Sequence, residues 1–156
     1  MILTNLQILL LRIVLGGLFL HLGIGKLSEG WLTSGDQLSK SLENFHQQAT
    51  GIQRLYIETV AAPHVSTWSR LIAAGETALG ISLLIGLLVR LSTALGIFMV
   101  LNLHAATGNL YSLEFFGSAY AALIVTTLLV LLLARAGRWA GVDAILARSN
   151  PRGYFW

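Results

Sequence analysis

Four long apolar stretches constrain the fold of this chain more than any other feature of its sequence. They cover residues 6–25, 71–89, 91–107 and 117–134. An α-helix rises about 1.5 Å per residue, so about 20 apolar residues cross the roughly 30 Å hydrocarbon core of a bilayer. Each stretch has this length or nearly so. We therefore predict an all-α, polytopic membrane protein, built as one four-helix bundle domain over residues 1–156.

The amino-acid composition agrees with a membrane protein. Hydrophobic residues make up 55% of the chain and charged residues 11%, a balance outside the usual range of soluble domains. The chain has no cysteine, which excludes disulfides, thiolate metal ligands and cysteine nucleophiles. Any redox chemistry must therefore come from a cofactor or from a partner protein. The basic residues are sparse and biased toward the tail, so we expect no nucleic-acid partner.

Two segments outside the spans have amphipathic patterns. Residues 27–67 connect the first two spans, and their apolar residues recur at helical spacing after Asp36 and again between Gly51 and Pro63. We predict that they form a short helical cap on the extracytoplasmic side. In the amphipathic C-terminal tail, residues 135–156, apolar residues line one side of a short helix among arginines. Such a helix is expected to lie on the surface of the lipid bilayer.

The distribution of arginines predicts the orientation of the chain in the membrane. Basic residues collect in the turn between the second and third spans and after the fourth span, a pattern typical of cytoplasmic segments. They are Arg90, Arg135, Arg138, Arg148 and Arg152. We predict an integral protein of a bacterial or archaeal cytoplasmic membrane, with both termini in the cytoplasm.

Arg12 and Glu76 stand out because they place a charge inside otherwise apolar spans. A charge at the bilayer centre costs at least about 2.5 kcal/mol, so each residue is a candidate for function. A helix turns about 100° per residue, which puts Arg12 on a narrow stripe of the first span that ends at Lys26. The stripe consists of Arg12, Gly16, Phe19, Gly23 and Lys26.

The second span presents two faces that are suited to contact protein. Glu76 shares one face with Ala73, Gly80 and Leu83. Small residues follow the opposite side, where they permit close helix contact. They are Ala74, Ala78, Ser82 and Gly86. We therefore expect Glu76 to lie inside the bundle, with both faces of its helix packed on protein.

Several polar residues fall in the outer half of the predicted bundle, beneath the cap. They are His21, Lys26, Glu76, Asn102 and His104. We predict a polar pocket there. Arg12 lies about 12 Å deeper than Glu76, a gap that its long side chain bridges in large part. Two interpretations of Arg12 and Glu76 stay open, a structural ion pair between the first two spans or contacts with a substrate or quinone.

A haem is a less favoured alternative for the two histidines. His21 and His104 lie at similar depth, so they are candidates for axial ligands if their helices face each other. A metal site that combines them with Glu76 is weaker still, because no residue spacing places these three side chains together. We therefore expect no metal.

Three sequence motifs resemble a known family. The resemblance rests on RIVLGGLFLHLGIGKL in the first span, on LIAAGETALGISLLIGLLVRLSTALG across the second and third, and on GRWAGVDAIL in the tail. These motifs are similar to the DoxX/DoxD family of four-span membrane proteins. The long cap and the ending NPRGYFW look closest to the DoxD branch, the small membrane subunit of thiosulfate:quinone oxidoreductase.

The resemblance implies a membrane subunit of a quinone-linked complex, beside another subunit that handles the sulfur substrate. On this hypothesis Arg12, Lys26 and Asn102 contact quinone or a small anionic substrate. Glu76 handles protons together with His21 or His104. The alternative is a non-catalytic accessory or assembly subunit of a larger respiratory or photosynthetic membrane complex. Whether the chain is catalytic and whether it forms a homo-oligomer stay open.

Overall fold

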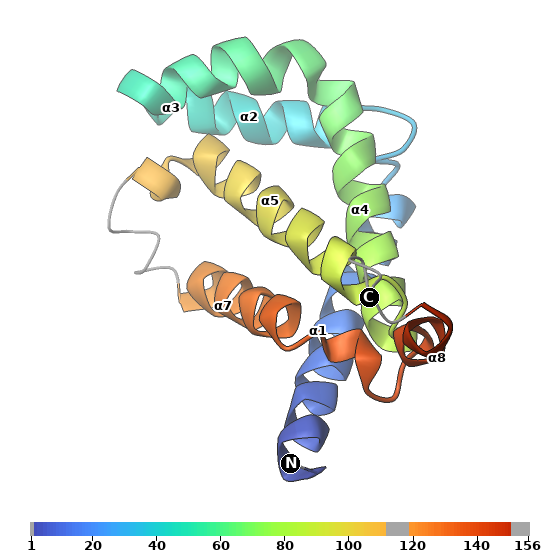
Figure 1. Cartoon of the computed structure of the whole chain (residues 1–156). Helices are drawn as coiled ribbons and strands as arrows, with labels where there is room; N and C mark the ends of the chain where they lie inside the picture. Colours follow the sequence, from blue (N-terminus) through green and yellow to red (C-terminus); the bar gives the residue numbers. More distant parts are fainter. Residues whose placement is uncertain (1, 112–118, 151–156) are drawn as a thin grey trace.

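The protein is a helical bundle. The structure, a computed structural model, describes residues 2–111 and 119–150, with side chains from residue 5 onward. No strand occurs in this described part. The four long helices are α1 (Ile2–Ser28), α4 (Val65–Ile85), α5 (Val89–Thr107) and α7 (Ala119–Leu133), shown in Figure 1. The predicted all-α architecture is confirmed.

Three helical segments of the described chain are long and apolar enough to cross a membrane. They are Asn5–Ser28, Gly51–Ile85 and Val89–Thr107. The apolar α7 has 15 residues, which correspond to about 22 Å of helix. The fourth predicted span began at residue 117, and residues 117–118 lie outside the described part.

The turn between α4 and α5 comes earlier in the chain than the predicted boundary at residue 89. Helix α4 ends at Ile85, because Gly86 and Leu88 both take left-handed backbone conformations, with φ of 72° and 51°. A right-handed helix cannot continue through such residues. The turn at residues 86–88 therefore reverses the chain within a few residues.

Helices α1 and α4 pack side by side (Figure 1), and glycines form the seam between them. A Cβ atom added at Gly23 would lie 2.8 Å from the Cα of Thr77, and one added at Gly80 would lie 2.7 Å from the Cα of Leu20. Only glycine allows backbones to come this close. The stripe that begins at Arg12 and ends at Lys26 is thus the face of α1 that meets α4.

The other face of α4 departs from the prediction. Ser82 and Gly86 are buried, but Ala74 and Ala78 are exposed. The expectation that both sides of this helix pack on protein along their length was therefore wrong. The reason is visible in Figure 1, where α4 and α5 meet at their common turn and then diverge toward the other end of the bundle.

A cap of short helices covers the open ends of α4 and α5. It consists of α2 (Asp36–Gln48), α3 (Gly51–Tyr56) and the turns that join α3 to α4. Helix α3 continues through a π-helical turn, Ile57–Ala61, and a short 3-10 turn, Ala62–His64, into α4. The cap packs through Leu38, Leu42 and Ala61 on Ala106 of α5. The two helical segments predicted within residues 27–67 are therefore present.

The main apolar core lies below the cap and joins α1, α4, α7 and the first turn of α5. Its buried members are Leu15, Phe19, Leu79, Leu83, Val89, Ile124, Leu128, Leu131 and Ala136. The chain then forms a 3-10 turn, Ala136–Arg138, and the C-terminal helix α8 (Val142–Ser149). In Figure 1, α8 lies beside the turn between α4 and α5.

Candidate functional site

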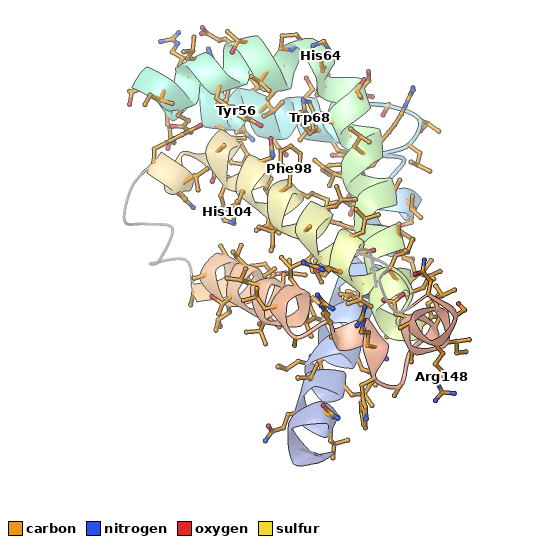
Figure 2. The ribbon with its side chains drawn as sticks, viewed as in Figure 1. Tyr56, His64, Trp68, Phe98, His104 and Arg148 are labelled. Atoms are coloured by element: carbon orange, nitrogen blue, oxygen red, sulfur yellow. The ribbon has the colours of Figure 1, made fainter. Side chains whose placement is uncertain are left out.

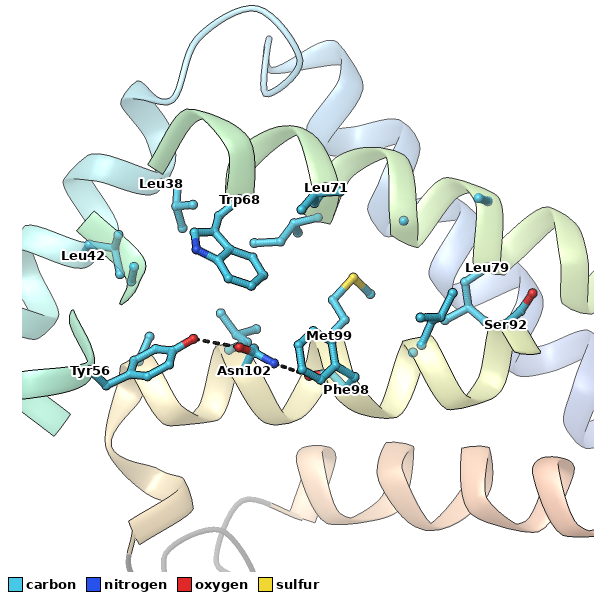
Figure 3. Close-up of a pocket in the computed structure, with 18 residues that line it drawn as sticks. Leu38, Leu42, Tyr56, Trp68, Leu71, Leu79, Ser92, Phe98, Met99 and Asn102 are labelled. Atoms are coloured by element: carbon cyan, nitrogen blue, oxygen red, sulfur yellow. Dashed lines mark hydrogen bonds between the residues drawn. The ribbon is translucent and has the colours of Figure 1, made fainter. Parts of the chain in front are cut away.

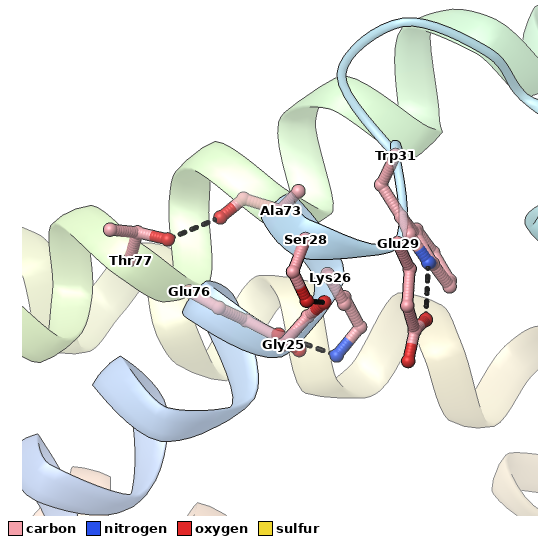
Figure 4. A network of polar contacts seen from close by, with 8 residues as sticks. All are labelled: Gly25, Lys26, Ser28, Glu29, Trp31, Ala73, Glu76 and Thr77. Carbon is pink, nitrogen blue, oxygen red and sulfur yellow. Dashed lines mark hydrogen bonds and ion pairs between the residues drawn. The ribbon is translucent and has the colours of Figure 1, made fainter.

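The carboxylate that was predicted inside the second span pairs with a lysine. Lys26 Nζ lies 2.5 Å from Glu76 Oε2. The Glu76 side chain is 9% exposed and that of Lys26 is 21% exposed, and the ammonium also lies 5.5 Å from the ring centroid of Trp31. Figure 4 shows the pair between α1 and α4, near the loop that carries Trp31. Each charge offsets the desolvation cost of the other, which allows both to remain in an apolar helix pair.

The candidate ion pair between Arg12 and Glu76, one of the two interpretations left open by the sequence, is absent, because Glu76 pairs with Lys26 and Arg12 binds backbone carbonyls. The contact of Gly23 with Thr77 sets the register of α1 against α4, and it places the next turn of α1, with Lys26, beside Glu76. Arg12 precedes Gly23 by 11 residues, which correspond to about 16 Å along the helix. Arg12 therefore lies near the other end of the seam.

Arg12 holds the C-terminal tail. Its Nη1 donates to the carbonyl oxygens of Ala136 at 2.9 Å and Trp139 at 3.3 Å, and its Nη2 donates to that of Ala140 at 2.8 Å. The whole residue is 2% exposed. Both terminal nitrogens of the guanidinium thus bind the backbone of the segment before α8. This contact gives Arg12 a structural role, and its contact with a substrate or quinone stays a prediction.

Asp143 completes this arrangement. Its side chain accepts the backbone N–H of Leu88 at 2.7 Å and that of Val89 at 3.0 Å, and its own N–H donates to the carbonyl of Gly86 at 2.8 Å. The carboxylate therefore caps the N-terminus of α5, where a negative charge is favourable. We refer to Arg12, Asp143 and the backbone that they bind, residues 86–89 and 136–140, as the tail lock.

The amphipathic pattern of the tail predicts a helix on the membrane surface and gives no buried role to Asp143. Asp143 is 1% exposed. One signal was available, since Asp143 is the single acidic residue of residues 135–156 and stands among arginines. The glycines around it form a second signal. A Cβ atom at Gly137 would collide with the Asp143 carboxylate, and one at Gly141 would lie 2.9 Å from Arg12 Nη1.

The remaining predicted residues lie in separate environments. His21 is exposed on α1, whereas the half-buried His104 lies on the α7 side of α5 (Figure 2). Asn102 belongs with the cap, because its Oδ1 accepts the hydroxyl of Tyr56 at 2.8 Å and its Nδ2 donates to the carbonyl of Phe98 at 2.8 Å. Over residues 2–111 and 119–150, no cluster of three or more histidine or acidic side chains is arranged to hold a metal ion.

A cavity of about 300 Å³ lies between α4 and α5, beneath the cap (Figure 3). Its walls are almost entirely apolar, and Trp68, Phe98 and Met99 contribute large side chains. Tyr56 and Asn102 provide polar groups at the cap end. Among the predicted site residues, Asn102 alone lines this cavity. Glu76 of α4 instead faces Lys26 of α1, and neither residue lines the cavity.

The three motifs that suggested a family now have defined places, since the first two form the seam of α1 and α4 and the third forms the tail lock. The family described as TQO small subunit DoxD matches residues 7–152 of the chain. This chain belongs to the DoxD family. The resemblance to DoxX/DoxD proteins is therefore confirmed. No curated protein and no solved structure matches the chain.

Membership in the DoxD family agrees with the apolar helices of the structure. The matched residues include the seam, the cavity and the tail lock. Together with the candidate spans on α1, α4 and α5, the match makes this DoxD protein an integral membrane protein. The side of the membrane on which its termini lie stays a prediction.

Proposed function

We propose that this chain is the membrane subunit of a quinone-linked oxidoreductase in which thiosulfate is the electron donor. The match of residues 7–152 to the TQO small subunit family carries the proposal. The absence of cysteine from the sequence supports a division of labour, in which a partner subunit performs the sulfur chemistry. This chain provides the apolar environment in which the electrons reach a quinone.

Glu76 is the proposed proton-exchange group of this subunit. Reduction of a quinone to a quinol takes up two electrons and two protons, so the complex needs a group that gains and loses a proton inside the membrane. Glu76 is a buried carboxylate on a span, and Lys26 links it to a partly exposed position at the end of α1. His21 and His104 remain further candidates for the same task.

The proposal is tested with the complex of this chain and its partner subunits in proteoliposomes. Thiosulfate-driven reduction of a quinone is followed by its ultraviolet absorbance. We expect turnover that requires this chain, and we expect Glu76→Gln to remove most of it while the complex still assembles. Glu58→Gln removes an exposed carboxylate of the cap and is the matched control. A wild-type complex without quinone reduction contradicts the function, and an active Glu76→Gln complex contradicts the role of Glu76.

The tail lock favours a second candidate function, that of a non-catalytic accessory or assembly subunit. Arg12 and Asp143 both serve structural contacts, and the glycines of the seam serve helix packing. If the Lys26–Glu76 pair is structural as well, Glu76→Gln lowers the amount of assembled complex, while the complex that does assemble keeps its normal specific activity. The same assay therefore separates the two functions.

A further inference from the structure

The cavity between α4 and α5 has the chemistry of a binding site for a membrane-soluble ligand. We infer that it binds the ring of a lipid-soluble quinone, which enters sideways from the bilayer and meets Tyr56 and Asn102 beneath the cap. The choice of a quinone as the ligand rests on the proposed function. The position of the site rests on the mouth, the walls and the polar end of the cavity.

The mouth of the cavity opens among apolar side chains of two spans. Leu71 of α4 and Leu95 and Phe98 of α5 line the cavity, yet each is more than half exposed. Side chains that are exposed on the apolar part of a membrane helix contact lipid. A ligand dissolved in the bilayer therefore reaches the cavity directly between α4 and α5. A ligand from water would have to pass the cap.

The walls suit a flat, weakly polar ring. The indole of Trp68, the phenyl ring of Phe98 and the thioether of Met99 border the same space (Figure 3). Aromatic side chains pack well on planar rings, and the sulfur of methionine adapts to irregular shapes. Ligand cavities range from about 300 to about 1,000 Å³, so the volume here suits a ring head group. A long isoprenoid chain must extend through the mouth into lipid.

The cap end supplies the polar contacts that a quinone carbonyl needs. The hydroxyl of Tyr56 donates to Asn102 Oδ1, and Asn102 Nδ2 donates to the carbonyl of Phe98, as Figure 3 shows. A side-chain amide has two N–H donors, and a hydroxyl can rotate toward a new acceptor. A quinone oxygen can therefore accept a hydrogen bond from either residue. A few polar groups in an apolar cavity fix the orientation of a ligand.

Helix α4 offers a matched pair of positions for a test. Ala78 lines the cavity, whereas Ala74, one turn earlier, does not, and both are exposed. Ala78→Phe adds a ring in the cavity, and Ala74→Phe adds the same ring outside it. A milder pair is Tyr56→Phe, which removes the hydroxyl at the polar end, and Tyr111→Phe, which removes the hydroxyl of an exposed tyrosine that does not line the cavity.

The binding experiment uses the full chain in phosphatidylcholine nanodiscs and a photoreactive azido-benzoquinone with a short isoprenoid chain. We expect saturable labelling of Tyr56, Trp68 or residues 95–106, mapped by mass spectrometry. Ala78→Phe should reduce labelling strongly, and Ala74→Phe should leave it unchanged. Tyr56→Phe should weaken binding about three- to tenfold, the effect of losing one hydrogen bond. Labelling spread evenly over the lipid-facing surfaces of α1 and α7 would overturn the inference. Unchanged labelling of both Ala78→Phe and Tyr56→Phe would overturn it as well.

Turnover by the assembled complex separates this inference from the proposed function. If the wild-type and Ala78→Phe complexes reduce quinone at the same rate, the quinone site is elsewhere, although the function holds. If the wild-type complex reduces no quinone while Ala78→Phe still blocks labelling of the cavity, the ligand site holds and the proposed function fails. Loss of both labelling and turnover in Ala78→Phe supports the inference and the function together.

Discussion

The carboxylate of Asp143 accepts the backbone N–H of Val89 at 3.0 Å, across 54 positions of sequence. This hydrogen bond joins the C-terminal tail to the first turn of α5. Arg12 joins the same tail to α1 through the carbonyls of Ala136 and Ala140. Two buried charged side chains thus hold three distant parts of the chain together.

Replacing Asp143 with asparagine should destabilise the protein by about 1–3 kcal/mol, because one amide oxygen must serve two N–H donors and the negative charge at the start of α5 is lost. Thermal unfolding in detergent micelles measures the change. Asp36→Asn, which alters an exposed acid at the start of α2, is the control. Equal melting temperatures for the two variants would show that the tail lock contributes little to the stability of the protein.

Replacing Arg12 with lysine should loosen the tail, since an ammonium donates from one point and cannot reproduce the spread of the guanidinium across several carbonyls. We expect trypsin to cleave after Arg135 or Arg138 roughly tenfold faster, as local opening becomes more frequent. Limited proteolysis with mass spectrometry records these cuts. The control is Arg54→Lys, at an exposed position of the cap, which should leave the cleavage rate unchanged. An unchanged cleavage rate in Arg12→Lys would show that other contacts hold the tail.

Gly23→Ala should separate α1 from α4, because the new methyl group would press on the backbone of Thr77. We expect a loss of about 1–3 kcal/mol from this overpacking. Gly25→Ala is the matched control on the same helix, since a Cβ atom there has no neighbour within 4 Å. Unfolding by sodium dodecyl sulfate in mixed micelles compares the two. Equal stabilities of the two variants would show that the seam accommodates the methyl group with no loss of unfolding free energy.

A double-mutant cycle on Lys26 and Glu76 should show strong coupling. Lys26→Met leaves a buried carboxylate without its partner, and such a change costs about 3 kcal/mol or more. The double variant Lys26→Met with Glu76→Gln should lose less stability than the sum of the single changes. The exposed pair Arg54 and Glu58 is the control, where coupling should be small. Additive losses at Lys26 and Glu76 would show that the pair does not stabilise the bundle.

Periodicity was a sound guide to the faces of single helices. The stripe from Arg12 to Lys26 meets α4, and Glu76 is buried as predicted. Such faces follow from the pitch of one helix, so neighbouring residues contain the information. Periodicity could not predict the partner of each charged side chain, because the partner depends on the register between two helices.

That register is set where two backbones touch. The contact between Gly23 and Thr77 brings Lys26 to Glu76, while Arg12 is left beside Gly86 at the start of the tail lock. The rise per residue gave the depths of Arg12 and Glu76 in the bilayer, and it left most of the gap between them to the arginine side chain. It could not show that a nearer cation would pair with the carboxylate. It also could not show that backbone carbonyls from residues 136–140 would satisfy the guanidinium.

Local patterns were sufficient for the all-α membrane fold, the helical cap and the family, because apolar length, helical pitch and short motifs are properties of contiguous residues. Only the tertiary structure decided which charges pair, that Asp143 is buried, and that a cavity lies between α4 and α5. These features depend on the register and divergence of helices, which many residues distant in sequence determine together.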